Sequence, residues 1–113
     1  MHDLKYANEI LNALKKNAAE KDKSRGIVVN IKLSPFSHVT AEGLDATFQL
    51  LMEGEEYGKV RLNIQTSEFS IHCKNCKHDS KHREPVFECP NCKSYDFDIG
   101  KGVEFCIDSI EIE

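Results

Sequence analysis

The sequence predicts an α+β fold in which two helices pack on a small β-sheet and a small lobe with four cysteines is inserted into the chain. Three observations predict it. Apolar residues recur at helical spacing in two segments, they alternate with polar residues in several others, and four of the five cysteines stand in two close pairs. Because the order is helix, strand, helix, strand, lobe, strand, we expect the last strand to return to the core sheet.

The first two elements are a helix and a strand. From 3 to about 21, apolar residues follow the three-and-four spacing of a helix with one buried face: Leu4, Ala7, Ile10, Leu11, Leu14 and Ala18. Gly26, after a charged stretch, predicts where this helix has ended. Residues 27–33 then alternate as a strand, with Val29, Ile31 and Leu33 on one face.

A second helix and a second strand follow. Thr40 is placed to cap the helix. Its predicted buried face consists of Leu44, Phe48, Leu51 and Met52. Residues 60–65 alternate between apolar and polar side chains, which predicts a half-buried strand. Phe69 and Ile71 then lead into the first pair of cysteines.

The second half of the chain predicts a ribbon and a returning strand. Between the cysteine pairs we expect a polar loop as far as Arg83 and a short strand over 84–88. Alternation over 95–99, a turn at 100–102 and renewed alternation over 103–107 follow. Ile110 and Ile112 fall on the opposite parity, so we predict a β-bulge at Ser109.

These elements define the expected domain organisation. Residues 1–68 and 100–113 form an α+β domain, and residues 69–99 form the inserted lobe. The chain of 113 residues has no apolar run long enough to span a membrane and no secretory signal pattern, so we expect a cytoplasmic protein.

The paired cysteines predict a zinc site. Cys73-Lys-Asn-Cys76 and Cys89-Pro-Asn-Cys92 are separated by twelve residues, a spacing that brings four sulfurs to one tetrahedral ion. Four thiolates leave no open position for water or substrate, so we interpret the zinc as structural. Without an export signal, metal ligation is favoured over disulfides.

The amino terminus predicts a second metal site of another kind. Met1-His2-Asp3 places an imidazole next to a free α-amine and to backbone amides. A set of nitrogen ligands in a square plane selects nickel(II) or copper(II). His2 is too large to favour removal of Met1, so the amine of Met1 is available as a ligand.

Charge and composition bear on the other function classes. With 15 basic and 19 acidic residues the net charge is −4, which disfavours nucleic-acid binding. The competing hypothesis is a zinc ribbon that acts as a nucleic-acid-binding or transcription-related adaptor, since the lobe carries Lys74, Lys77, Lys81 and Arg83. No nucleophile and base pair, phosphate-binding glycine loop or open metal site is visible, so we do not expect an enzyme.

Two further residues have less specific interpretations. We assign no role to Cys106, because a lone strand cysteine is usually a packed small apolar residue or an idle thiol and not a fifth ligand. We expect His38 to be a solvated or hydrogen-bonded loop histidine, although its loop could approach the nickel end.

The chain as a whole resembles the HypA/HybF family, the nickel metallochaperones of hydrogenase and urease maturation. The resemblance rests on the Met1-His2-Asp3 start, the amphipathic helix, the turn Ser37-His38-Val39 and the two cysteine pairs. It also includes the ending, from Ser94-Tyr-Asp-Phe-Asp-Ile99 to Ile107-Asp-Ser-Ile-Glu111. The resemblance therefore covers essentially the full chain.

The resemblance implies a function. Nickel would bind to His2, with the amine of Met1 and the backbone nitrogens of His2 and Asp3 completing a square, and zinc would bind to the four cysteines. The expected partners are a maturation GTPase, the hydrogenase large-subunit precursor and, as a further possibility, urease maturation proteins. His78, two residues after Cys76, is similar to a histidine that accompanies a cysteine pair in some members, and could modulate or replace a thiolate.

The chain departs from the family pattern in three places. Asp3 stands where members usually have glutamate, which makes a partner contact by that side chain less certain than the assignment of His2. No histidine follows Cys92, which puts a symmetric exchange of histidine for cysteine in doubt. The glycine-bearing turn before the second helix is altered to Ser37-His38.

Overall fold

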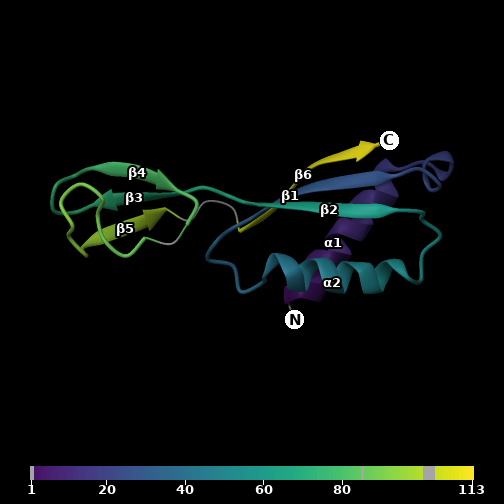
Figure 1. Cartoon of the computed structure of the whole chain (residues 1–113), viewed down its shortest axis with the longest axis horizontal. Coiled ribbons are helices and arrows are strands. Elements are labelled where there is room, and N and C mark those ends of the chain that lie inside the picture. Colours follow the sequence, from purple (N-terminus) through teal and green to yellow (C-terminus); the bar gives the residue numbers. More distant parts are fainter. Residues whose placement is uncertain (1, 85, 101–103) are drawn as a thin grey trace.

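The structure is a computed structural model that describes residues 2–84, 86–100 and 104–113. Its elements are α1 (His2–Asn17), a 3-10 turn (Glu20–Asp22), β1 (Ile27–Leu33), α2 (Ala41–Met52), β2 (Val60–Thr66), β3 (Phe69–Cys73), β4 (Asp79–His82), β5 (Phe97–Gly100) and β6 (Phe105–Ile112). The strands form two separate three-stranded sheets. They lie at opposite ends of an elongated molecule of 56 × 26 × 17 Å (Figure 1).

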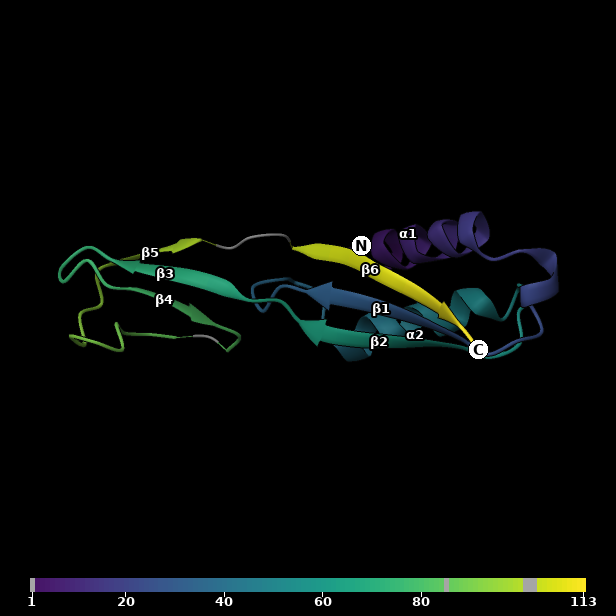
Figure 2. The same ribbon diagram turned by 90° about the horizontal axis from the view of Figure 1, so that it is seen from above.

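The first sheet has the order β2-β1-β6 and forms, with α1 and α2, the part that we call the helical half. β1 pairs with β2 in parallel, and α2 is the crossover between them; β6 pairs antiparallel with the other edge of β1. Both helices cover the same face of this sheet, with α1 toward β6 (Figure 2). The predicted return of the last strand to the core sheet is therefore confirmed.

The core of the helical half lies between this face and the helices. Along β1, buried residues alternate with more exposed ones, as predicted. Val29 and Phe48 are fully buried, and both belong to a cluster that joins the sheet to the two helices. The cluster consists of Tyr6, Ala7, Ile10, Leu11, Leu14, Ile27, Val29, Ile31, Val39, Leu44, Phe48 and Val60. The helical spacing in the sequence predicted six of these residues, but it was wrong at Leu4, which is 43% exposed, and it missed Tyr6, which is buried in its place.

Two local predictions are confirmed by hydrogen bonds and register. The hydroxyl of Thr40 accepts a hydrogen bond from the amide of Gly43 at 3.0 Å and caps α2. In β6, Ser109 pairs with Asn30 while Ile107 pairs with Ile31, so Asp108 is the extra residue of a β-bulge. The bulge lies within one residue of the predicted position, and it places Ile107 and Ile110 against the same core.

The end of the first helix was predicted wrongly. α1 ends at Asn17 and not near Lys21, and the residues that follow form the separate 3-10 turn. The reason is a local competition: the carboxylate of Asp22 accepts a hydrogen bond from the amide of Ala19 at 3.0 Å, which caps a new turn in place of the continued helix.

The second sheet has the order β4-β3-β5 and, with the turns that carry the cysteines, forms the cysteine lobe. Here the prediction of a strand over 84–88 was wrong, because the described residues of that segment form no strand. Between the two cysteine pairs, the strand that pairs with β3 is instead β4, in the polar stretch that we expected to be a loop. Its side chains are half-buried or exposed, so apolar alternation could not reveal it. The predicted turn at 100–102 lies mostly outside the described residues.

Candidate metal centres

The four cysteines of the two pairs form one cluster at the end of the cysteine lobe. Their sulfur atoms all lie within 4.8 Å of one another. The sulfur of Cys73 is 3.6 Å from that of Cys92, and the sulfur of Cys76 is 3.7 Å from that of Cys89. Four sulfurs at about 2.3 Å from one zinc ion in a tetrahedron are roughly 3.8 Å apart. The cluster therefore has the size of a four-cysteine metal site with no open position.

Each cysteine pair lies on a turn of the same form. The amide of Lys77 donates to the carbonyl of Cys73 at 3.0 Å, and the amide of Lys93 donates to the carbonyl of Cys89 at 2.9 Å. Both lysines adopt the left-handed backbone conformation, with φ of 64° and 65°. The chain thus reverses directly after the second cysteine of each pair. Two equivalent turns present their sulfurs to one point.

Two asparagines donate hydrogen bonds across the cluster, each from its own turn to a sulfur of the other. The Nδ2 atom of Asn75 is 3.7 Å from the sulfur of Cys92, and the Nδ2 atom of Asn91 is 3.4 Å from the sulfur of Cys76. Such donors stabilise the thiolate over the thiol. The side chain of Asn91 is the largest influence that lowers the pKa of Cys76, to about 6. The thiolate is the form that binds metal.

The other thiols differ in their tendency to ionise. A hydrogen bond from the backbone of Ser94 lowers the pKa of Cys92. At Cys73 the backbone of Cys76 lowers the pKa, but desolvation by burial and the neighbouring thiols outweigh it and raise the pKa to about 11. The cluster thus combines thiols that ionise readily with one whose proton a metal ion must displace.

We expect Asn91→Ala to weaken zinc binding by the cluster about 10- to 100-fold, the usual effect of removing a hydrogen bond to a ligand. Without Asn91 the pKa of Cys76 rises, so protons compete with the metal at higher pH and zinc is released at a higher pH on acidification. Competition with a chelator and a pH titration of bound zinc measure both effects.

The sequence provides graded controls for this experiment. Asn75→Ala should act in the same direction but less, because its bond to sulfur is longer. Asn12→Ala, at an exposed position of α1, should change nothing. Equal zinc affinity in Asn91→Ala and Asn12→Ala would show that the cross-turn hydrogen bonds do not support the site.

His78 lies beside the cluster without belonging to it. Among the described residues, the four cysteine sulfurs are the only group of three or more ligand atoms close enough to hold one metal ion. The side chain of His78 is exposed, and its carbonyl accepts a hydrogen bond from the amide of Cys73 at 3.0 Å. The structure therefore assigns His78 a backbone contact in the first turn, and the modulating role of its imidazole stays a prediction.

Basic side chains of the cysteine lobe face carboxylates. The amino group of Lys74 is 3.4 Å from Asp98, and that of Lys93 is 3.7 Å from Glu88. These exposed pairs contribute little to stability, but they reduce the positive potential that phosphates would meet. This arrangement offers no support for the nucleic-acid hypothesis.

The amino-terminal site begins at α1. Its predicted nickel ligand His2 is the first residue of the helix and has an exposed side chain, whereas Met1 lies outside the described residues. The carboxylate of Asp3 lies 3.1 Å from the point that a Cβ atom on Gly43 would occupy. Because Gly43 belongs to the first turn of α2, the absence of its side chain lets the two helix starts lie close together.

His38 lies next to this site, which the sequence suggested only as an option. The centres of the His38 and His2 rings are 6.0 Å apart, with the ring planes inclined by 31°. His38 is exposed and precedes α2 in the loop that follows β1. The fold thus brings two imidazoles together that are far apart in the sequence.

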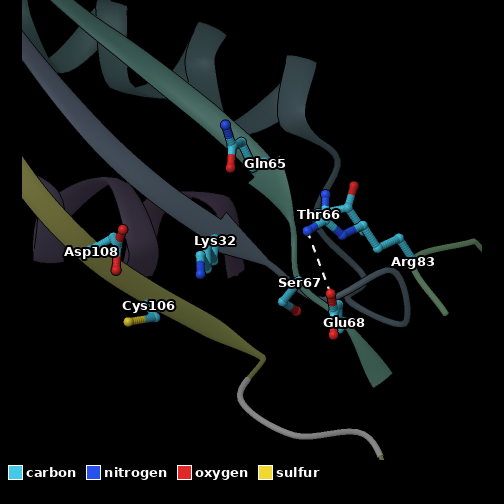
Figure 3. Close-up of a pocket in the computed structure, with 8 residues that line it drawn as sticks. All are labelled: Lys32, Gln65, Thr66, Ser67, Glu68, Arg83, Cys106 and Asp108. Carbon is cyan, nitrogen blue, oxygen red and sulfur yellow. Dashed lines mark hydrogen bonds and ion pairs between the residues drawn. The ribbon is translucent and has the colours of Figure 1, made fainter. Parts of the chain in front are cut away.

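A cavity of about 480 Å³ lies between the helical half and the cysteine lobe, beside the link from β2 to β3. Apart from Cys106, its lining side chains are polar or charged: Lys32, Gln65, Thr66, Ser67, Glu68, Arg83 and Asp108 (Figure 3). Arg83 and Glu68 form an ion pair of 3.5 Å at its edge. Cys106 is exposed here and is not part of the metal-binding cluster found among the described residues.

Comparison with known proteins identifies the family to which this chain belongs. The sequence model of a family described as "Hydrogenase/urease nickel incorporation, metallochaperone, hypA" matches residues 1–112. The chain belongs to the HypA family. A hydrogenase maturation factor HypA from Moorella thermoacetica is 32% identical over 115 residues, and the match covers 100% of both chains. The recognition of this family from the sequence is confirmed.

Other HypA proteins agree in sequence and in fold. The hydrogenase maturation factor HypA of Methanocaldococcus jannaschii is 26% identical over 100% of this chain and 98% of its own. The solution structure of the Ni metallochaperone HypA from Helicobacter pylori superposes with a TM-score of 0.57 at 20% identity, over 97% of this chain and 96% of that one. The predicted α+β class with an inserted four-cysteine lobe is confirmed.

Within this HypA chain, the sequence located the cysteine cluster and gave the approach of His38 to the amino terminus as an option, but it missed the asparagine donors of the cluster. The signal for these donors is the repeated Cys-x-Asn-Cys pattern, which places one asparagine at the same position of each turn. The position of His38 beside His2 has no local signal, because it depends on how α1 packs on α2.

In the described part of the chain, neither helix has the length and apolar character needed to cross a membrane.

Proposed function

We propose that this protein is a nickel metallochaperone that binds Ni(II) at its amino terminus and delivers it to a nickel–iron hydrogenase during maturation, with urease as a further client. The observation that supports this most is the match of the nickel-incorporation family over residues 1–112, together with an exposed His2 at the start of α1. His2, the amine of Met1 and the backbone nitrogens of His2 and Asp3 are the proposed ligands.

Such a site suits a protein that must release its metal. Few ligands at an exposed chain end can be replaced one at a time by those of a receiving protein, whereas a closed cage retains its ion. The proposed receivers are a maturation GTPase, the hydrogenase large-subunit precursor and urease maturation proteins. Nitrogen ligands in a square plane select nickel(II) or copper(II), so availability of the metal contributes to specificity.

We propose zinc as the structural metal of the cysteine cluster. The donor set supports it, because Cys73, Cys76, Cys89 and Cys92 offer four sulfurs at tetrahedral separations. When bound, zinc would cross-link the two cysteine turns. The chain's own groups favour the thiolate form of Cys76, through Asn91 above all. In this proposal the closed cysteine site has a structural role, and the open amino-terminal site delivers nickel.

The division corresponds to a proposed domain organisation. The helical half, predicted as residues 1–68 and 100–113, would bind nickel, and the lobe, predicted as residues 69–99, would bind zinc. Each has its own sheet. β5 extends to Gly100, so one strand residue of the lobe sheet falls just beyond the predicted boundary. We also propose that the protein acts in the cytoplasm.

A Ni(II) titration tests the nickel proposal. The protein should be loaded with zinc, carry an untagged amino terminus, and be compared with His2→Ala and with His72→Ala as a matched control. His72 is an exposed imidazole of β3 that pairs with Asp79 in the lobe. We expect His2→Ala to lose tight nickel binding, His72→Ala to retain it, and both to keep one zinc per chain. Nickel binding that survives His2→Ala would refute the proposed site.

We further propose that His78 modulates the lobe in response to nickel. Its side chain is exposed next to the first cysteine turn, while its carbonyl accepts a hydrogen bond from the amide of Cys73. We expect His78→Ala to change the nickel affinity of zinc-loaded protein several-fold while zinc content is kept. Identical nickel affinities of His78→Ala and the unmodified protein would end this proposal and leave the metal sites independent.

A further inference from the structure

The amino-terminal site has a second imidazole within reach. His2 and His38 are separated by 36 positions in the sequence, yet their ring centres are 6.0 Å apart. Both side chains are exposed, so water and metal ions can reach the space between them. Neither imidazole takes part in the side-chain hydrogen bonds found among the described residues, whereas those of His72 and His82 do. Their nitrogens are thus accessible to a shared ion.

The loop that carries His38 is held in place. The amide of Val39 donates to the hydroxyl of Ser37 at 3.1 Å, and the side chain of Val39 is buried in the core. On the other side, the amide of Ser37 donates to the carbonyl of Ser34 at 3.1 Å. His38 therefore stands on a loop fixed at both sides of it, and its position relative to α2 is defined.

The start of α1 is held against the same region. Tyr6 and Ala7 are buried one turn beyond His2, and they belong to the core cluster that includes Leu44 of α2. Asp3 lies beside Gly43 at the start of α2. The proximity of His2 to His38 thus follows from the packing of α1 on α2.

We propose that His38 is a second imidazole ligand of the bound nickel ion, opposite or beside His2, where it replaces one of the four nitrogens of the proposed square. This inference rests on the proposed function and deepens it. An imidazole nitrogen binds a first-row metal at about 2.0 Å, so two rings on one ion have centres roughly 4.5 to 6.3 Å apart, depending on the angle between them. The observed 6.0 Å lies within this range. Imidazole also suits nickel as a ligand type.

A ligand from the body of the protein changes the character of the site. With ligands only from the first three residues, the ion would depend on the order of the chain end. With His38, the ion connects the start of α1 to the loop before α2. A receiving protein would then have to displace a loop side chain as well as the terminal ligands, so His38 sets both affinity and release.

The test uses zinc-loaded, untagged protein and the variants His38→Ala, His38→Gln, His2→Ala and the control His72→Ala. Nickel dissociation constants come from competition with a chelator, and X-ray absorption of the nickel-bound protein counts the imidazoles around the ion. We expect both His38 variants to bind nickel at least 10-fold more weakly and the count to fall from two imidazoles to one. His72→Ala should match the unmodified protein in both measurements.

The outcomes separate this inference from the proposed function. One imidazole in the unmodified protein, with unchanged affinity in both His38 variants and loss of binding in His2→Ala, would overturn the role of His38 and keep the amino-terminal site. Nickel binding unaffected by His2→Ala would overturn both. Because His38 is exposed, its replacement should leave the fold intact, which circular dichroism and the zinc content verify.

Discussion

We expect Cys89→Ser to abolish zinc binding and to unfold the cysteine lobe while the helical half stays folded. The sheet of the lobe has short strands, and β4 and β5 have four residues each. Its buried side chains are few, chiefly Phe69, Ile71, Cys73 and Cys89 itself. Binding of a structural zinc ion contributes about 10–16 kcal/mol in small zinc domains, which is as large as the whole stability of many proteins. A lobe of this size cannot replace that contribution by burial.

Metal analysis and amide hydrogen exchange measure this result. Exchange should become fast throughout β3, β4 and β5 and remain slow in β1 and α2. Cys106→Ser is the matched control, because this cysteine is exposed and lies outside the cluster. Zinc content at one per chain in Cys89→Ser, or protected amides in a lobe without zinc, would contradict the assignment of the metal as the support of the lobe.

We expect Phe48→Ala to destabilise the helical half by about 3–5 kcal/mol, the usual cost of removing a buried aromatic side chain. Phe48 is fully buried on the inner face of α2 and belongs to the cluster that joins both helices to the sheet. Chemical denaturation gives the free energy of unfolding. Nickel affinity should fall in the same variant, because the packing of α2 positions the loop beside His2.

The same helix provides the control. Leu50 lies two residues further along α2 and is 67% exposed, so Leu50→Ala should change the free energy of unfolding by less than about 0.5 kcal/mol. Zinc content should be one per chain in both variants. Equal destabilisation by Phe48→Ala and Leu50→Ala would show that α2 does not pack on the sheet through the face described.

Local patterns in the sequence determined much of this fold. The alternation in 27–33 and 60–65 identified β1 and β2, because one face of each is covered by helices while the other is open. The hydroxyl of Thr40 identified the start of α2, and the change of parity near Ser109 identified the bulge in β6. The spacing of the cysteines identified the metal cluster, since a pair on one turn is a short-range feature.

The tertiary structure decided what depends on distant contacts. β4 exists because its backbone pairs with β3, which side-chain pattern does not encode. The side-chain amides of Asn75 and Asn91 each donate to a sulfur of the other's turn, because the two turns meet at one cluster. His38 reaches His2 because α1 packs on α2. Local periodicity reports which face of an element is buried, whereas the meeting of two elements follows from how their buried faces fit together in the folded chain.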